Sequence, residues 1–430
     1  MEVRDPIHGG MRVGPRELTV VDHPFVQRLR NIRQTGFSAL PFPGATHSRH
    51  SHCLGTMHLA GRAFDSVYDG WEFSSPAVRA RLRACLRLAA LCHDLGHSPF
   101  SHCTEFAMPA VEKLRLSWFA EGRQPRDRRA NHEDYTLAIL EHTSLAEVVG
   151  RHFPFTTRHI AALVDLDVDP GDDFFVDRGL DHRRLMSQII SSELDVDRLD
   201  YLVRDSYYSG ARYGQIDVGW LVSNLRPWPT DDGVSLGLDV RAVYAFDDFM
   251  IARHHMFLMV YFHHKSVVYE ELLKRHVASP ECTWSIPADL DAYLFVDDIS
   301  LEAHLRERAT GWARRVVDRH PFQRILERHG TPQDVDLSRE ADALEDAGVE
   351  VIHAGSTGKI SRYNVFGQKR QRAPAIYVVQ RGAIGAPTTA SPLADATRVF
   401  QRYADARRIA RLYVAPEDVA TATTVLAPFL

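Results

Sequence analysis

The sequence has no apolar run long enough to cross a membrane, since no stretch approaches the ~20 consecutive apolar residues that such a helix needs. Its first residues, MEVRDPIHGGMRV, are charged and lack the apolar core of a signal peptide. We therefore expect a cytoplasmic protein without a membrane partner.

Cysteine is scarce and positive charge is not in excess. The five cysteines among 430 residues are odd in number and show no CxxC spacing, so reduced thiols are expected rather than a disulfide scaffold. The formal net charge of -5 offers no broad positive field to attract nucleic acid. Nucleic acid is therefore not expected as the main partner, and any phosphate must be bound locally.

The apolar pattern predicts a mainly α fold. Apolar residues recur at helical spacing from about residue 16 to residue 275, interrupted by WPTDDGVSLGLDV, which predicts a small β-hairpin near residues 226–241. Further along, helical stretches are followed by the strand-like runs VEVIHAG, APAIYVVQRG and ARLYVAP. We predict a helical catalytic domain at residues 1–282 and a smaller α+β lobe at residues 283–430.

Histidine is the residue that stands out. Of 23 in the chain, seven fall between His47 and His102. The run LRACLRLAALCHDLGHSPFSH places His93 and Asp94 at the end of an apolar helix, just before Gly96 interrupts it. An imidazole and a carboxylate there can converge on one divalent cation, although an isolated His-Asp pair is more often structural.

Further motifs accompany this pair in a fixed order. They are DPIHG at 5–9, DHPFVQRLR at 22–30, FPGATHSRHSHCLG at 42–55, LCHDLGHSPFSH at 91–102, HE at 132–133, DVDRLDYLVRD at 195–205 and a segment from 252 to 265. Together they resemble the HD-domain superfamily, specifically the branch of deoxynucleoside triphosphate triphosphohydrolases that includes bacterial dGTPases. The resemblance covers about 260 residues and implies a helical HD-domain body.

The resemblance implies one divalent transition metal, Mn, Fe, Zn or Ni, held by His52, His93, Asp94 and Asp197. Two neutral imidazoles and two carboxylates neutralise such an ion and leave coordination positions open, as a hydrolase requires. Mg is expected on the substrate triphosphate, because it prefers phosphate oxygens.

The catalytic residues implied by the resemblance are His102, His132, Glu105 and Arg49. His102 would act as the general acid toward the leaving 5′ oxygen, a task that suits an imidazole titrating near neutrality. His132 would form a proton relay with Glu105, where vertebrate-type relatives carry an aspartate. Arg49 could grip phosphate oxygens bidentately, and it shares the cavity with His52 if that segment is helical.

The substrate contacts implied by the resemblance include a sugar pocket. Tyr201 and Asp205 follow Asp197 at intervals of four on one helix face, where the tyrosine would crowd the 2′ position and favour deoxyribose. A tyrosine there is equally compatible with a core position, and each basic residue taken singly with a surface charge. The other implied contacts are Gln34, Arg49, His97, Arg198, Arg253, Tyr261 and Lys265.

A regulatory site is a separate expectation. Asp22, Gln27 and Arg30 match residues of the family's regulatory nucleotide pocket, which implies an activating nucleotide and assembly into a dimer or tetramer. A helix that begins at Pro24 explains part of the same segment structurally, so both interpretations stay open.

The predicted activity is hydrolysis of deoxynucleoside triphosphates to deoxynucleoside and tripolyphosphate. Water activated at the metal would attack the α-phosphorus, and His102 would protonate the leaving nucleoside. His50, Ser51 and Cys53 depart from the usual family residues, which leaves the specificity open. The alternative is an HD-type phosphodiesterase or nuclease acting on another nucleotide phosphoester, and a more distant one is a non-catalytic nucleotide sensor.

Overall fold

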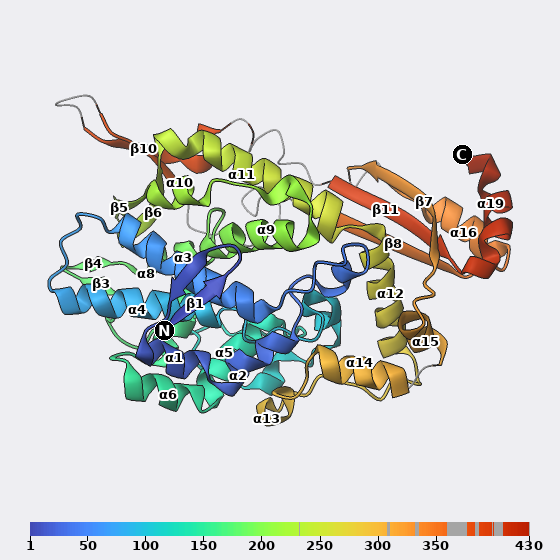
Figure 1. Cartoon of the computed structure of the whole chain (residues 1–430), viewed down its shortest axis with the longest axis horizontal. Helices are drawn as coiled ribbons and strands as arrows, with labels where there is room; N and C mark the ends of the chain where they lie inside the picture. The colour runs from blue at the N-terminus through green and yellow to red at the C-terminus, as the bar shows by residue number, and fades with distance from the viewer. Residues whose placement is uncertain are drawn as a thin grey trace.

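The computed structural model describes residues 1–231, 233–307, 310–331, 335–358, 376–382, 387–397, 399 and 407–429. Helices predominate across these residues, and the strands form small separate sheets (Figure 1). The predicted mainly α fold is confirmed. Within this part of the chain, no helix combines the length and apolarity needed to cross a membrane.

The helical body begins after a short antiparallel hairpin of β1 (Glu2–Asp5) and β2 (Gly9–Arg12). A minor hairpin of β3 (Val176–Asp177) and β4 (Leu180–Asp181) interrupts it. Its helices are α1 (Pro15–Val21), α2 (Pro24–Arg28), α3 (Arg49–Val67), α4 (Pro76–Cys92), α5 (His132–His142), α6 (Leu145–His152), α7 (Thr157–Val164), α8 (Arg183–Ile190), α9 (Val196–Ser209), α10 (Val218–Ser223), α11 (Val243–Met256) and α12 (His264–Ala278). The helical spacing read from residue 16 to 275 is therefore confirmed.

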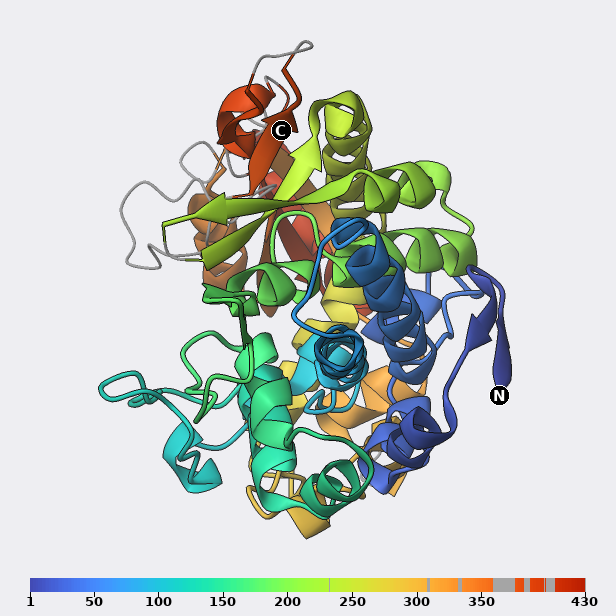
Figure 2. The same cartoon turned by 90° about the vertical axis from the view of Figure 1, so that its left-hand side faces the viewer.

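Helices α3 and α4 form the centre of this body. Ser75 caps α4 by accepting a hydrogen bond from the Val78 amide at 3.3 Å, and Pro76 occupies the first turn, where no amide proton is needed. The inner faces of both helices are fully buried, as Leu59 and Leu88 illustrate with exposures of 0%. Figure 2 views the body from the end opposite the C-terminal sheet. The close packing of α3, α4 and α9 holds the ends of three helices at fixed positions.

The predicted β-hairpin is present and belongs to a larger sheet. Strands β5 (Leu225–Thr230) and β6 (Gly233–Asp239) pair antiparallel, and β6 also pairs in parallel with β9 (Tyr377–Gln380). Strand β10 (Thr389–Pro392) completes the order β10-β9-β6-β5. Residues 373–375 of the predicted strand APAIYVVQRG lie outside the described residues.

The C-terminal part mixes helices and strands, as predicted. The sheet β7-β11-β8 is antiparallel and carries α16 and α19 over its own small core. The elements are α13 (Leu290–Tyr293), α14 (Asp298–Glu307), α15 (Gly311–Val317), β7 (Gln323–Gly330), α16 (Ser338–Asp346), β8 (Val351–Gly358), α17 (Leu393–Ala396), β11 (Arg407–Val414) and α19 (Val419–Leu426). Tyr293 packs in the core of the helical body, whereas α14 and α15 share a core with α12. A domain boundary between residues 282 and 283 stays a prediction.

Candidate active site

The four residues predicted as metal ligands lie together at the ends of α3, α4 and α9. The His52 Nε2 atom is 3.0 Å from Asp197 Oδ1 and 3.6 Å from Asp94 Oδ2. The His93 Nε2 atom is 3.3 Å from Asp94 Oδ1 and 3.6 Å from Asp197 Oδ1. Three helices that are distant in sequence thus bring two imidazoles and two carboxylates to one place.

The turn that follows α4 depends on Gly96. A Cβ atom at this position would lie 2.0 Å from the His132 carbonyl oxygen and 2.4 Å from the Thr136 amide nitrogen, so only glycine permits this approach to α5. The Thr136 hydroxyl accepts from the Gly96 amide at 2.9 Å and donates to the His93 carbonyl at 3.0 Å. The segment carrying His93 and Asp94 is therefore fixed against α5.

The donor atoms suit a divalent cation. The Nε2 atoms of His52 and His93 are buried and have no hydrogen-bond partner among the described residues. The Nδ1 atom of His52 faces Asp200 at 2.7 Å and that of His93 faces the Ala90 carbonyl at 2.8 Å, which places each ring proton on Nδ1. Each Nε2 atom is then directed at carboxylates, an arrangement that a cation bound between them would stabilise.

The electrostatic field at this place is strongly negative. Burial lowers the pKa of His52, but its contacts with Asp197 and Asp200 outweigh burial and raise it to about 10. The side chain of His52 is 0% exposed, whereas that of Asp197 is 34% exposed, so the cluster opens to solvent at Asp197. A cation entering from that side would meet this field directly.

A buried network supports His52 from behind. Asp200, which is 0% exposed, contacts His8 Nε2 at 2.6 Å and accepts two hydrogen bonds from Arg204 at 2.8 and 2.9 Å. Arg204 also donates to Asp5 at 2.7 Å. Sequence analysis missed these supporting roles, although the motifs DPIHG and DVDRLDYLVRD contain all four residues.

Arg49 is directed at the predicted metal ligands. As the first residue of α3 it is buried, and its Nη1 atom donates to Asp94 Oδ2 at 2.5 Å while its Nε atom donates to Ser101 Oγ at 2.8 Å. The expectation that Arg49 and His52 share a cavity required this segment to be helical, which it is. One edge of the guanidinium is bound to Asp94, and its charge faces the cluster.

Three histidine rings line the adjacent wall. His97 and His132 stack with ring centroids 4.0 Å apart, and His102 meets both edge-on at 4.8 and 5.1 Å. Glu105 joins two of them, because its carboxylate lies 3.3 Å from His102 Nδ1 and hydrogen-bonds with His132 Nδ1. His102 is the exposed member, with 64% of its side chain accessible.

The protonation of this wall is uneven. Burial, together with the charges of Arg49 and His132, holds the pKa of His97 well below its usual value. Burial acts in the same direction on His132, but its hydrogen bond with Glu105 outweighs burial and raises the pKa of His132. Hydrogen bonds with His102 and His132 overcome burial to hold the pKa of Glu105 low. One imidazole is thus kept neutral beside one that retains a proton.

The residues predicted to hold the sugar form a second wall. Asp205 accepts a hydrogen bond from the Tyr261 hydroxyl at 2.6 Å, and its other oxygen lies 2.6 Å from His47 Nε2. The ring of Tyr201 meets that of Tyr261 edge-on at 6.3 Å. Both carboxylate oxygens of Asp205 therefore already have protein partners, and His47 is one that sequence analysis did not single out.

The other predicted substrate residues differ in placement. Arg198 is buried and donates to Asp195, the cap of α9, at 2.6 Å. Arg253 lies over the Phe257 ring at 5.2 Å and hydrogen-bonds with Tyr201. The side-chain Oε1 atom of Gln34 is buried without a partner among the described residues, while its backbone amide donates to the His47 carbonyl at 3.0 Å. Lys265 is exposed at the start of α12. The described contacts of Lys265 do not reach the cluster.

The predicted regulatory residues lie at α1 and α2. Pro24 is the first residue of α2, as the structural interpretation predicts, and His23 caps that helix. Asp22 is exposed, Gln27 donates to the Val21 carbonyl at 2.7 Å, and Arg30 donates to Gln27 at 2.7 Å. A regulatory nucleotide and an oligomer both stay predictions.

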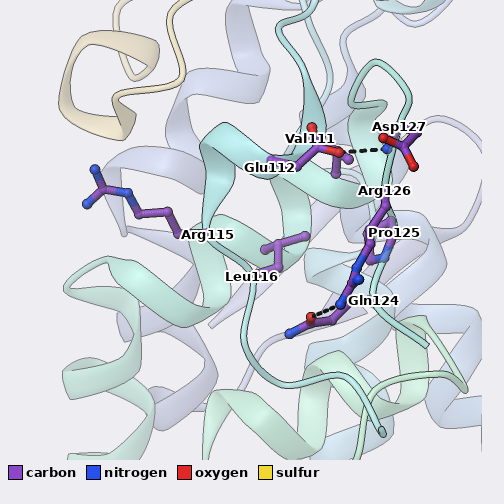
Figure 3. Close-up of a pocket in the computed structure, with 8 residues that line it drawn as sticks. All are labelled: Val111, Glu112, Arg115, Leu116, Gln124, Pro125, Arg126 and Asp127. Atoms are coloured by element: carbon purple, nitrogen blue, oxygen red, sulfur yellow. Dashed lines mark hydrogen bonds between the residues drawn. The ribbon is translucent and has the colours of Figure 1, made fainter. Parts of the chain in front are cut away.

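A surface hollow lies apart from these residues. It has a volume of about 320 Å³, and Figure 3 shows its lining residues. Its polar groups largely satisfy one another, since Glu112 accepts from the Asp127 amide at 2.6 Å and Arg126 donates to Gln124 at 3.4 Å. The hollow contains none of the predicted site residues, and we assign it no role.

Comparison with known proteins gives two family matches. The family described as HD domain matches residues 49–205, and the one described as HD associated region matches residues 216–351. The first match runs from Arg49 to Asp205 and therefore contains every predicted metal ligand.

Individual relatives agree with this match. An uncharacterised protein of Methanocaldococcus jannaschii is 28% identical over 324 residues, 75% of this chain and 59% of that protein. The deoxynucleoside triphosphate triphosphohydrolase SAMHD1 homolog of Dictyostelium discoideum is 32% identical over 48% of this chain and 36% of that protein. A solved structure of a hypothetical protein from Aquifex aeolicus covers 99% of both chains with a TM-score of 0.73 at 23% identity, a similarity of fold. The chain spans only part of the length of these curated relatives.

Proposed function

Because the chain belongs to the HD-domain phosphohydrolase superfamily, we propose that it hydrolyses deoxynucleoside triphosphates to deoxynucleoside and tripolyphosphate. One observation carries the proposal. His97 Nε2 lies 3.2 Å from Asp94 of the cluster, and Tyr201 follows Asp197 by one turn of α9, so one molecule could offer its phosphates to the histidines and its sugar to the tyrosines.

The cluster supplies the place for the metal. The four residues would hold a divalent transition metal, which when bound polarises a phosphoryl oxygen and lowers the pKa of water. Arg49 would contribute positive charge toward the phosphates, because its buried guanidinium lies next to the cluster. Mg is expected on the triphosphate itself.

The histidine wall handles the proton of the leaving group. Cleavage at the α-phosphorus leaves negative charge on the 5′ oxygen of the nucleoside, which must be protonated. Glu105 lies 3.3 Å from Nδ1 of the exposed His102, so Nε2 of a protonated His102 is the atom that would donate to that oxygen. His132, with its raised pKa, keeps a proton within reach of the same carboxylate.

The tyrosine wall favours a deoxyribose. Tyr201 lies one helical turn from Asp197, where a ring would crowd a 2′ hydroxyl group. Asp205, held between His47 and Tyr261, can accept a hydrogen bond from a 3′ hydroxyl group.

The test is product analysis on the full chain. We would load the purified protein with Mn or Fe, add Mg, and supply each dNTP and NTP singly and in pairs, with the products separated by anion-exchange chromatography. Deoxynucleoside and tripolyphosphate are expected from the wild type, and neither from His93→Ala. The matched control is His320→Ala, which removes an exposed histidine outside the cluster.

Other products would contradict the proposal. Release of pyrophosphate with a nucleoside monophosphate, or cleavage of a phosphodiester by a protein that leaves dNTPs intact, would instead identify a phosphodiesterase or nuclease. Turnover of no nucleotide under any metal would leave a nucleotide sensor as the function.

A further inference from the structure

A second cluster of metal-binding side chains lies where α12 meets α14. His276 is near the end of α12, Cys282 follows in the next loop, and His304 is on α14. Helices α12 and α14 lie on the same side of the molecule in Figure 1. The Nε2 atoms of the two histidines are 3.2 Å apart, and Cys282 Sγ is 3.9 Å from His304 Nε2. The three donor atoms all lie within 4.8 Å of one another.

Two of these separations are close to those around one tetrahedral ion. With Zn–N distances of ~2.0–2.1 Å and a Zn–S distance of ~2.3 Å, the ligand atoms of a tetrahedral zinc site lie roughly 3.3 Å apart for two nitrogens and roughly 3.6 Å apart for nitrogen and sulfur. The observed 3.2 and 3.9 Å differ from these values by a few tenths of an ångström. Two imidazoles and a thiolate are also a ligand set that zinc favours.

The loop that carries Cys282 is already shaped for this role. Ser279 ends α12 by donating from its hydroxyl to the His276 carbonyl at 2.7 Å, and the Cys282 amide donates to the Ser279 carbonyl at 3.2 Å. These bonds fold the chain back so that the thiol returns toward the imidazole six residues earlier. Little backbone ordering would accompany metal binding, which favours affinity.

The protonation state of His276 also suits a ligand. It is 1% exposed, and burial together with His304 lowers its pKa, so its ring is neutral near pH 7. The thiol of Cys282 has a pKa raised by burial, so binding of a metal would displace its proton to solvent.

We propose that His276, Cys282 and His304 form a zinc site separate from the HD cluster, with the fourth position open to water. The ion would tie the loop after α12 to α14 and so fasten the start of the C-terminal part to the helical body. The alternative is a direct hydrogen bond between the two imidazoles without any metal. This inference does not depend on the proposed hydrolase activity.

Cobalt(II) in place of zinc gives the sharpest test. A cobalt–thiolate bond produces a charge-transfer band in the near ultraviolet, which imidazole and carboxylate ligands alone do not give. The full chain titrated with cobalt should develop this band, and Cys282→Ser should lose it. The matched control is Cys53→Ser, because Cys53 lies beside His93 and Asp94 and is the other thiol that could reach a metal.

Zinc content provides an independent measurement. In a His93→Ala background, which disables the HD cluster, one zinc per chain should remain after dialysis. Adding His304→Ala or His304→Asn should lower the zinc affinity at least tenfold, with far-ultraviolet circular dichroism verifying the fold. His304→Ala alone should retain nucleotide hydrolysis, which separates this site from the proposed activity.

Three results would overturn the site. They are a wild-type chain without the cobalt band, a band that survives Cys282→Ser but vanishes in Cys53→Ser, and a folded His93→Ala chain that retains no zinc. In each case the two imidazoles would simply share a hydrogen bond.

Discussion

The carboxylate of Asp200 accepts a hydrogen bond from His52 Nδ1 at 2.7 Å, in a part of the core where neither side chain is exposed. Because the proton is held on Nδ1, the Nε2 lone pair faces the metal cluster. Arg204 and His8 hold Asp200 in turn. The orientation of one predicted ligand thus depends on residues that cannot touch the metal.

Asp200→Asn is therefore expected to weaken metal binding by roughly 10–100-fold, because the neutral amide no longer orients and charges His52. A competition titration against a chromophoric chelator would measure this. The control is Asp248→Asn, which makes the same carboxylate-to-amide replacement at an exposed position. Unchanged affinity in a folded Asp200→Asn protein would show that the network has no influence on the metal.

Glu105 is predicted to set the alkaline limb of the pH–rate profile. The contact of Glu105 with His132 raises the pKa of that imidazole against the effect of burial. His132 therefore keeps its proton to a pH above the usual pKa of a histidine. In Glu105→Gln the charges of Asp94 and Glu133 still raise the pKa of His132, but the largest influence opposing burial is removed, so the proton is lost at a lower pH. The alkaline limb of kcat/KM should then shift to lower pH, whereas Glu105→Asp should largely preserve it. Coincident profiles for wild type and Glu105→Gln would rule out this role.

Gly55 is predicted to be essential for the fold around Asp200. A Cβ atom at Gly55 would lie 2.0 Å from Asp200 Oδ1 and 2.5 Å from Arg204 Nη2, so the buried ion pair would have to move. Gly55→Ala should lower the free energy of unfolding by roughly 3 kcal/mol. The matched control is Gly150, which lies inside α6 with nothing within 4 Å of its Cβ position. Gly150→Ala should raise the free energy of unfolding by about 0.5–1 kcal/mol. Urea denaturation would measure both, and equal stability of the two variants would contradict the clash.

Local sequence was sufficient to predict most helices, whereas the set of residues at the cluster followed from the resemblance to a family. Periodicity indicates which face of a helix is buried, and the α4 run stops at the glycine-containing turn that presents His93 and Asp94. Each of these signals lies within a few residues of the feature it predicts. The ordered motifs then indicated which distant segments belong together.

Long-range pairings were not predictable in this way. His8 and Asp200 are 192 residues apart, and no periodicity indicates that they meet. The parallel pairing of β6 with β9 was likewise not predictable, because the alternation of residues in a strand does not indicate which other strand it pairs with. Substrate contact by Arg198 stays a prediction, and its hydrogen bond with Asp195, three residues earlier, was not foreseen. The positive charge of Arg198 alone does not predict whether its guanidinium binds the substrate or the Asp195 carboxylate.

The C-terminal sheet should be sensitive to acid through Glu327. Arg411, which is 3% exposed, donates to its carboxylate at 2.5 Å, and Arg324 does so at 2.7 Å. Burial opposes ionisation, but the contacts with His329 and these arginines lower the pKa of Glu327 from 4.5 to about 2. Because the folded value lies below the unfolded one, the stabilisation is complete above about pH 4.5 and is lost as the pH falls toward 2.

Glu327→Gln should therefore open β7 and β11 more readily than wild type at neutral pH, and the difference should shrink as the pH falls through this window. Hydrogen exchange of the strand amides, read by mass spectrometry at several pH values, would follow it directly. Glu345→Gln, an exposed change on the neighbouring α16, should leave the exchange of β7 and β11 unaltered at every pH. Equal protection in wild type and Glu327→Gln at neutral pH would mean that Arg411 gains its stability from burial of its stem rather than from this carboxylate.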